Sequence, residues 1–354
     1  MASRSGPGTT SRTTVESGVC VVEMSDIFPA RARNGGLSPI DSLGRAIWVW
    51  RRRFDIVHAF DHRPAVSFPS LVGKARGAIL ISDWADLWGH GGIAEEREGA
   101  GRLLGMLDDF WERRFRQWAD GATVITSHLG RRLDAMGMPA RRRLLLPPGA
   151  NIDLIHPLDR AEARRWCGLP VDARIVVFTG FAPYDAELLG EVVWRILEGE
   201  PAATVVATGR MPEAMGIALR QRGLAGRLRD LGVVPFADLE KVLACADVLL
   251  LPYADKEVNR GRFPNRFGDY LASGRVVVTN RTGDLGDMVE ANRIAVLAPE
   301  EPEKFAREVV DLLNDPARCE EYAVRARRFA EEVLSWRMLA RRVEQFYIEA
   351  LFPH

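Results

Sequence analysis

Short runs of β-branched residues alternate with longer segments of helical spacing along most of the chain. Residues 175–179 and 204–208 form two such runs, and the helical pattern of residues 186–198 lies between them. The other runs that we expect to form strands are residues 19–22, 55–59, 79–81, 123–125, 143–146, 248–251, 276–279 and 294–297. A strand followed by a helix, repeated in this way, predicts parallel sheets with helices on both faces.

A proline-rich joint divides this alternation into two sets of strands. It covers residues 147–170 and contains two adjacent prolines, a glycine and a change of periodicity, which are typical of a domain boundary. A chain of 354 residues, 47% of them hydrophobic, is long and apolar enough for two cores. We therefore predict an α/β fold of two doubly wound, Rossmann-like domains that face each other across a cleft. The polar segment 1–17 is predicted to be a disordered tail.

The charge and cysteine content exclude several classes of protein. With 48 basic and 48 acidic side chains, the chain lacks the basic excess of a protein that coats nucleic acid. Its four cysteines lie far apart without a C-x-x-C pair, which indicates reduced thiols in a cytoplasmic protein rather than a disulfide or zinc framework. No apolar run reaches the roughly 18 residues that a membrane span needs.

Glycines and arginines follow the predicted strands of the second set, at the sheet edge where doubly wound folds bind ligands. Arginines and the amides of a helix start favour phosphate, and Asp269, one turn into a predicted helix over 265–273, can accept hydrogen bonds from a ribose diol. These residues predict a site for a nucleoside diphosphate, although arginines merely solvated on a loop are the alternative. The predicted donor-binding residues are Gly180, Arg210, Arg260, Arg262, Asn265, Arg266, Asp269, Gly283 and Asp284.

Five segments, taken in order, carry a resemblance to a known family. They are "FDIVHAF", "DGATVITSHLGRRLDAMG", "LLLPPGANIDLIHPL", "DLEKVLACADVLLLPY" and "FPNRFGDYLASGRVVVTN". Together they resemble the retaining glycosyltransferases of family four, which have the two-domain GT-B fold. The resemblance implies an acceptor-side domain over 18–147, a donor-binding domain over 148–335, and a last helix over 336–354 that crosses back to the first domain.

The same resemblance implies a reaction. A sugar would pass from a nucleoside diphosphate sugar to an acceptor hydroxyl with retention of configuration and without a cofactor. Arg266 and Arg262 would stabilise the charge of the leaving diphosphate, which could itself take the acceptor proton. Since the chain contains no D-x-D triplet, the resemblance implies a site without a metal ion. The implied partners are the donor and a carbohydrate, lipid-linked or small-molecule acceptor, with no nucleic acid.

The chain departs from the family's pattern at the donor site and near the first residues. Asp269 replaces the second of two glutamates, Gly261 stands in place of the first, and neither Arg nor Lys follows Gly180. Because "GVCVVEM" resembles the family's third strand, the first strand–helix–strand unit with its glycine loop is expected to be absent. These departures keep an alternative open, a catalytically inactive or truncated nucleotide-sugar-binding homologue that acts as a partner subunit. An epimerase on the same fold would need a stronger acid–base constellation.

Polar and aromatic residues end two strands of the first set, in "HAFDHRPAV" and "LISDWADLWGHGG". Asp83 or Asp86 lies near the place where the family often has a histidine that orients acceptor and donor. The predicted catalytic residues are Asp83, Asp86, His58 and Arg266, and the predicted acceptor-side residues are His62, Arg63, Trp84 and Trp88. A histidine satisfied by backbone groups and tryptophans that belong to the core are the alternatives.

Residues 97–118 contain a basic and aromatic helical face. Such a face could lie on an anionic membrane, which would make the protein peripheral at the inner face of that membrane. An ordinary surface helix is the alternative.

Overall fold

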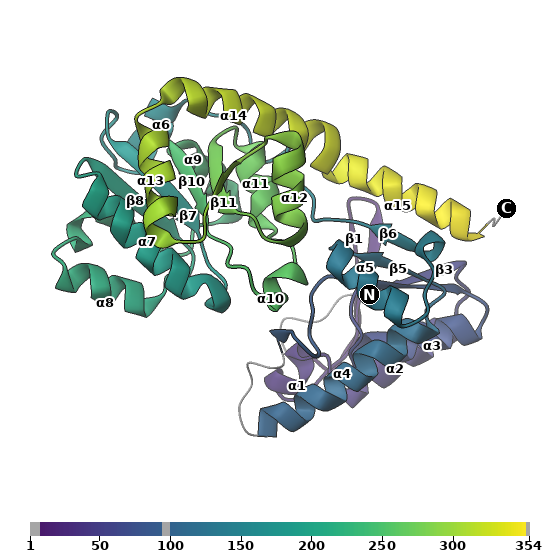
Figure 1. The fold of residues 1–354 in the computed structure, drawn as a ribbon. Coiled ribbons are helices and arrows are strands. Elements are labelled where there is room, and N and C mark those ends of the chain that lie inside the picture. The colour runs from purple at the N-terminus through teal and green to yellow at the C-terminus, as the bar shows by residue number, and fades with distance from the viewer. Residues whose placement is uncertain (1–7, 94–99, 352–354) are drawn as a thin grey trace. The chain divides into compact units, whose positions relative to one another are not determined.

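The structure is a computed structural model that describes residues 8–93 and 100–351 (Figure 1). Contacts divide the chain into two units. Unit 1 comprises Met1–Leu146 together with Arg342–His354, and unit 2 comprises Pro147–Arg341. The division falls in the proline-rich joint and again inside the last helix.

Unit 2 contains a six-stranded sheet in the order β12-β11-β10-β7-β8-β9, in which all neighbouring strands are parallel. From β7 the chain continues to β8 and β9 on one side, whereas β10, β11 and β12 lie on the other. The strand order therefore reverses between β7 and β10, which makes their carboxyl ends the switch point of the sheet. The strands are β7 Arg174–Thr179, β8 Ala203–Thr208, β9 Leu228–Asp230, β10 Val248–Leu251, β11 Val276–Asn280 and β12 Val296–Ala298.

Both faces of this sheet are buried. Val176, Val248 and Val278 belong to one core cluster with helices α7 and α13, and Val177 and Leu249 on the opposite face are also fully buried. Burial on both faces explains the continuous apolar strands of the sequence, since a parallel sheet is covered on each side. The helices are α6 Arg160–Trp166, α7 Ala186–Gly199, α8 Glu213–Gln221, α9 Leu239–Ala244, α10 Glu257–Arg260, α11 Arg266–Ala272, α12 Gly283–Asn292, α13 Pro302–Leu313 and α14 Pro316–Phe329.

Unit 1 contains a parallel sheet of four strands in the order β3-β4-β5-β6. Leu80, Phe115, Ala122 and Leu129 form the centre of its core. The strands are β3 Ile56–Ala59, β4 Ile79–Trp84, β5 Gly121–Val124 and β6 Arg143–Leu145, and the helices are α1 Ala30–Asn34, α2 Pro39–Trp50, α3 Pro64–Ala75, α4 Ala100–Trp118 and α5 Ser127–Ala135. With unit 2, this sheet confirms the predicted fold of two α/β domains with parallel sheets.

The last helix, α15 (Trp336–Leu351), begins in unit 2 and ends in unit 1. In unit 1 its Phe346 lies against Gly121 of β5, where an added Cβ would stand 3.3 Å from the phenylalanine ring. In unit 2 the indole nitrogen of Trp336 donates to Asn151 Oδ1 at 3.0 Å. Each end of the helix is thus held by its own unit.

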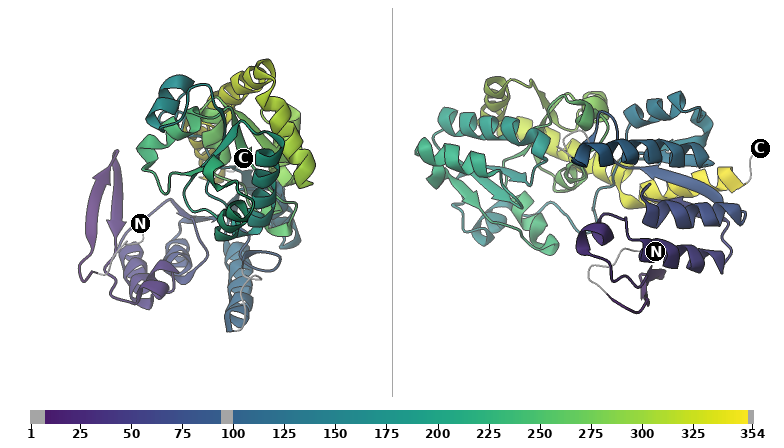
Figure 2. Two further views of the ribbon diagram at one scale, coloured as in Figure 1. Left: turned by 90° about the vertical axis from the view of Figure 1, so that its left-hand side faces the viewer. Right: turned by 90° about the horizontal axis from the view of Figure 1, so that it is seen from below.

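The first described residues form a β-hairpin, which corrects two predictions (Figure 2). Strand β1 (Arg12–Glu16) lies in the segment predicted to be a disordered tail, of which residues 1–7 are outside the described part. Strand β2 (Val19–Glu23) was predicted as a strand, but it pairs antiparallel with β1 and not with the parallel sheet. Ser17 and Gly18 join the two strands with φ values of +49° and +81°. Two positive φ values in a two-residue loop suit a hairpin turn, and the Ser-Gly pair is the sequence signal for it.

Candidate functional site

Two glycine turns meet at the switch point of the unit 2 sheet. Gly180 follows β7 with a φ of +55°, and Gly209 follows β8 with a φ of +86°. The amide of Gly180 donates to Thr208 O at 2.7 Å, and a Cβ on Gly209 would lie 3.3 Å from the Gly180 nitrogen. The positive φ values and this close approach of the backbones both require glycine. The turns leave a strand edge without side chains, which a ligand can approach closely.

Arg266, the first residue of α11, lies beside this edge. Its Nη1 donates to Thr179 O at 3.1 Å, and the same nitrogen is 4.0 Å from where a Cβ on Gly180 would stand. One turn later the hydroxyl of Tyr270 accepts the Thr179 amide at 2.7 Å, which ties α11 to the end of β7. Among the described residues, no carboxylate forms an ion pair with Arg266. Its positive charge is therefore left for a ligand.

The other predicted phosphate ligands differ from Arg266. Arg260 forms two hydrogen bonds with Asp255, at 2.8 and 2.6 Å, and Arg262 pairs with the buried Asp185 at 3.1 Å. Arg210 follows Gly209 on the exposed surface. The sequence-based prediction that Arg262 serves the leaving diphosphate is thus not supported, because a buried carboxylate already compensates its charge.

Asp269, the predicted ribose ligand, forms a hydrogen bond with Asn151 of the proline-rich joint. It accepts a hydrogen bond from Asn151 Nδ2 at 2.7 Å, and burial raises its pKa. Asn151 was not predicted from the sequence, since it is 118 residues away along the chain. Asn265 is exposed directly before α11. Gly283 opens α12 with a φ of +50°, followed by the half-buried Asp284.

In unit 1, His58 and Asp83 lie in one chain of hydrogen bonds. His58 Nδ1 is 2.6 Å from the Tyr347 hydroxyl of α15, and Nε2 is 3.1 Å from Thr123 Oγ1. Because Thr123 donates its proton to Asp83, its oxygen accepts from His58 Nε2–H, and Nδ1 then accepts from Tyr347. His58 is therefore satisfied by side chains rather than by backbone groups. Burial lowers its pKa to about 4 and raises that of Asp83.

This geometry predicts how pH acts on the stability of unit 1. The unfolded chain binds a proton at His58 near pH 6.5, whereas the folded chain does so only near pH 4. Stability is therefore lost as the pH falls between these values, by at most about 3 kcal/mol. The raised pKa of Asp83 acts in the opposite direction. Compared with a His58→Gln variant, the parent should lose stability to urea between pH 7 and pH 4; parallel pH curves would contradict the assignment.

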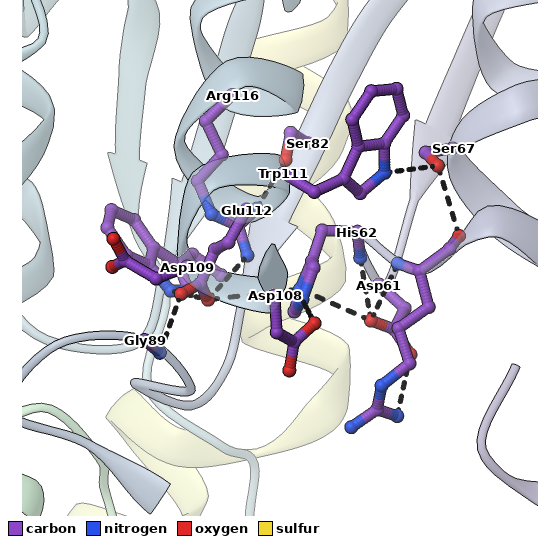
Figure 3. Close-up of polar contacts among 12 residues, drawn as sticks. Asp61, His62, Ser67, Ser82, Gly89, Asp108, Asp109, Trp111, Glu112 and Arg116 are labelled. Carbon is purple, nitrogen blue, oxygen red and sulfur yellow. Dashed lines mark hydrogen bonds and ion pairs between the residues drawn. The ribbon is translucent and has the colours of Figure 1, made fainter. Parts of the chain in front are cut away.

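His62 lies inside unit 1, in a polar cluster with α4 (Figure 3). Trp84 is buried in the same unit. His62 Nε2 is 2.8 Å from Asp108 Oδ1, and the indole nitrogen of Trp84 donates to Glu112 at 2.9 Å. Each side chain is only 1% exposed. Their predicted role as acceptor contacts is wrong in this structure, since a sugar cannot reach them. Trp84 is the core aromatic of the alternative interpretation.

Arg63, Trp88 and Asp86 remain at the surface near the end of β4. The guanidinium of Arg63 lies over the Trp88 ring at 4.1 Å and donates to Asp61 at 3.2 Å. Arg63, Trp88 and Asp86 are half-buried. Trp88 therefore offers part of its surface, but Arg63 already covers one face of its ring.

The face of α4 predicted to meet a membrane is partly exposed. Met106, Leu107 and Phe110 are each more than half exposed, next to Arg113 and Arg114. Residues 97–99 of the predicted helix lie outside the described part. In the part of the chain that the structure describes, no helix is long and apolar enough to cross a membrane. Peripheral contact through α4 stays a prediction.

Within 8–93 and 100–351, no three or more His, Cys, Asp or Glu side chains come together in a group that could hold a metal ion.

In the comparison with known proteins, a glycosyltransferase family model matches each of the two units. The family described as "Glycosyl transferase 4-like domain" matches residues 2–149, and "Glycosyl transferases group 1" matches residues 173–315. The D-inositol 3-phosphate glycosyltransferase of Thermobispora bispora is 28% identical over 60% of this chain and 52% of its own length. That of Geodermatophilus obscurus is 26% identical over 83% of this chain and 61% of its own length. The chain thus spans between half and two thirds of these curated relatives.

Solved structures with the same fold cover nearly the whole chain. A sucrose-phosphate synthase from Thermosynechococcus elongatus superposes with a TM-score of 0.74 at 18% identity, over 95% of this chain and 85% of its own. Anabaena HepE, solved with UDP and glucose, gives a TM-score of 0.69 at 15% identity, over 88% and 82%.

Proposed function

We propose that this chain, whose two parts match glycosyltransferase family models and whose fold is the two-domain GT-B fold, moves a sugar from a nucleoside diphosphate sugar to an acceptor hydroxyl with retention of configuration. The observation that carries the proposal is the switch-point site of unit 2. There the glycine turns at 180 and 209 meet a guanidinium, that of Arg266, which no described carboxylate compensates. HepE, which shares the fold, was solved with UDP and glucose, and this supports a nucleotide sugar as donor.

In the proposed reaction, Arg266 provides most of the electrostatic stabilisation of the leaving diphosphate. When the glycosidic bond breaks, the diphosphate gains negative charge while the sugar becomes oxocarbenium-like. A fixed guanidinium stabilises that charge more in the transition state than before it. The first amides of α12, a helix of 10 residues that begins at Gly283, add the positive end of a helix dipole. With this charge in place we propose a reaction without a cofactor, in which the leaving phosphate accepts the acceptor proton.

The acceptor is expected on unit 1. Arg63 and Trp88 are half-buried there, and a polyol acceptor could stack on the part of the Trp88 ring that Arg63, itself paired with Asp61, leaves open. The curated relatives are named for D-inositol 3-phosphate, an anionic polyol. It is therefore the first acceptor to assay, followed by simple sugars and lipid-linked acceptors.

Calorimetric titration of the full chain with UDP, GDP and ADP tests the proposal. We expect at least one of them to bind with a dissociation constant below about 1 mM, the affinity of a few charge-assisted hydrogen bonds. No binding of any of the three at millimolar concentration would contradict the site. Transfer from the matching nucleotide sugar then separates the enzyme from the alternative, a nucleotide-binding homologue without activity. The absence of Arg and Lys directly after Gly180 favours that alternative, and binding without transfer or donor hydrolysis would establish it.

A further inference from the structure

Asp185 is a buried carboxylate directly beside the switch point. It ends the short helix Pro183–Asp185, which follows the turn at Gly180. Its Oδ1 accepts the amide of Ala254 at 3.1 Å and Nδ2 of Asn259 at 2.7 Å, and its Oδ2 accepts Nη2 of Arg262 at 3.1 Å. The side chain is only 2% exposed. Three donors on one buried carboxylate compensate its charge.

These bonds join two loops that lie on opposite sides of the switch point. One loop runs from Gly180 to Asp185 after β7, and the other runs from Tyr253 to Arg262 after β10. Asn259 completes the connection, because its Oδ1 accepts Nε of Arg262 at 2.9 Å. The Tyr253 hydroxyl donates to the carbonyls of Asn259 and Arg262, at 2.9 and 3.1 Å. The second loop leads directly into α11, where Arg266 lies.

The pairing of Asp185 with Arg262 affects donor binding because each side chain compensates the charge of the other. An uncompensated carboxylate beside a diphosphate would repel it, and a free second guanidinium would compete with Arg266 for the phosphate oxygens. The Asp185–Arg262 pair removes both charges from the crevice. The pair also connects the segment after β7 with the one that leads into α11.

We propose that Asp185 is a positioning residue of the donor site, which holds Arg262 and the loop after β10 so that Arg266 is the guanidinium presented to the diphosphate. The inference rests on the proposed function, since it assigns a role within the same donor site.

The test uses an Asp185→Asn variant of the full chain, since asparagine keeps the shape but turns an amide donor toward Arg262. We expect the affinity for the best-binding nucleoside diphosphate to fall by about tenfold, the factor that one charge-assisted hydrogen bond supplies. The affinity for the corresponding nucleoside monophosphate should change much less, because the effect is confined to the diphosphate. A merely structural weakening would lower both affinities alike, and an unchanged or higher diphosphate affinity would overturn the proposal.

Asp247→Asn is the matched control. Asp247 also pairs with a buried arginine, Arg164, at 2.6 Å and accepts the amide of Ile175 at 2.7 Å, but at the amino end of β10. This variant should lose stability without a selective loss of diphosphate affinity.

Hydrogen exchange of the ligand-free chain supplies a readout that needs no nucleotide. Asp185→Asn should accelerate exchange of the Ala254 amide and of the segment up to Arg262, while Asp247→Asn should not. Equal exchange there in both variants would overturn the positioning role. If the parent binds no nucleoside diphosphate, the proposed function fails, and the exchange measurement still decides whether Asp185 fixes the loop.

Discussion

Replacing Glu112 by alanine should destabilise unit 1 by about 3–5 kcal/mol, because it leaves a buried charge without its partner. The carboxylate is 1% exposed and lies 3.6 Å from the guanidinium of Arg116, which is 2% exposed. Glu112 also accepts the indole N–H of Trp84 and the amide of Gly89, both at 2.9 Å. The substitution therefore removes the nearest carboxylate from a buried cation, which keeps its hydrogen bonds to Ser82 and the Asp83 carbonyl, and leaves two buried donors unsatisfied.

Urea denaturation monitored by tryptophan fluorescence measures this effect. Asp134→Ala is a suitable control in the same unit, since Asp134 pairs with Arg143 but is 55% exposed. Although the Arg143 side chain is only 13% exposed, the carboxylate of this pair is in water, so its loss should cost about 0–1 kcal/mol. If Glu112→Ala cost no more than the control, the polar cluster around His62 and Trp84 would have to be open to water rather than buried.

Most strands of the two sheets could be predicted from the sequence because their physical signal is local, but the short edge strand β9 was missed. Runs such as Val248–Leu251 are apolar throughout, as a strand buried on both faces must be, and glycine and proline punctuate them. The hairpin β1–β2 was missed for a reason that is also local. The segment that forms β1, RTTVE, is polar, and that outweighed its β-branched residues and the Ser17-Gly18 turn.

The donor edge, which is the sheet edge of unit 2 at Gly180, Gly209 and Arg266, could be located from the sequence. The partners of its charged side chains could not. Topology alone places Gly180, Gly209 and Arg266 at one edge, since the carboxyl ends of parallel strands meet there. The pairing of Arg262 with Asp185 spans 77 residues, and that of His58 with Tyr347 spans 289. No spacing rule connects residues so far apart. The sequence therefore showed four arginines that looked equivalent, and only the contacts distinguish the compensated ones from Arg266.

That distinction gives the prediction with the largest effect on binding. Arg266→Ala should weaken nucleoside diphosphate binding by about 1.5–3 kcal/mol, roughly 10- to 150-fold in the dissociation constant. The guanidinium is held by a hydrogen bond to Thr179 O, so it is oriented before the ligand arrives. Arg260→Ala should weaken binding less, because Asp255 already compensates that charge through two hydrogen bonds.

Calorimetry on the three proteins side by side, with Arg318→Ala as a control, measures the difference. Arg318 pairs with Glu308 on the helices α13 and α14 and contacts no residue of the donor edge that we describe. Arg266→Lys adds a further comparison, since it keeps the charge but loses the planar pair of donors that suits a phosphate. A lysine variant intermediate between parent and alanine would show that both charge and geometry matter. If Arg266→Ala bound as well as the parent, the diphosphate would have to be held by the helix amides and Arg210 alone, and the catalytic role proposed for Arg266 would fail with it.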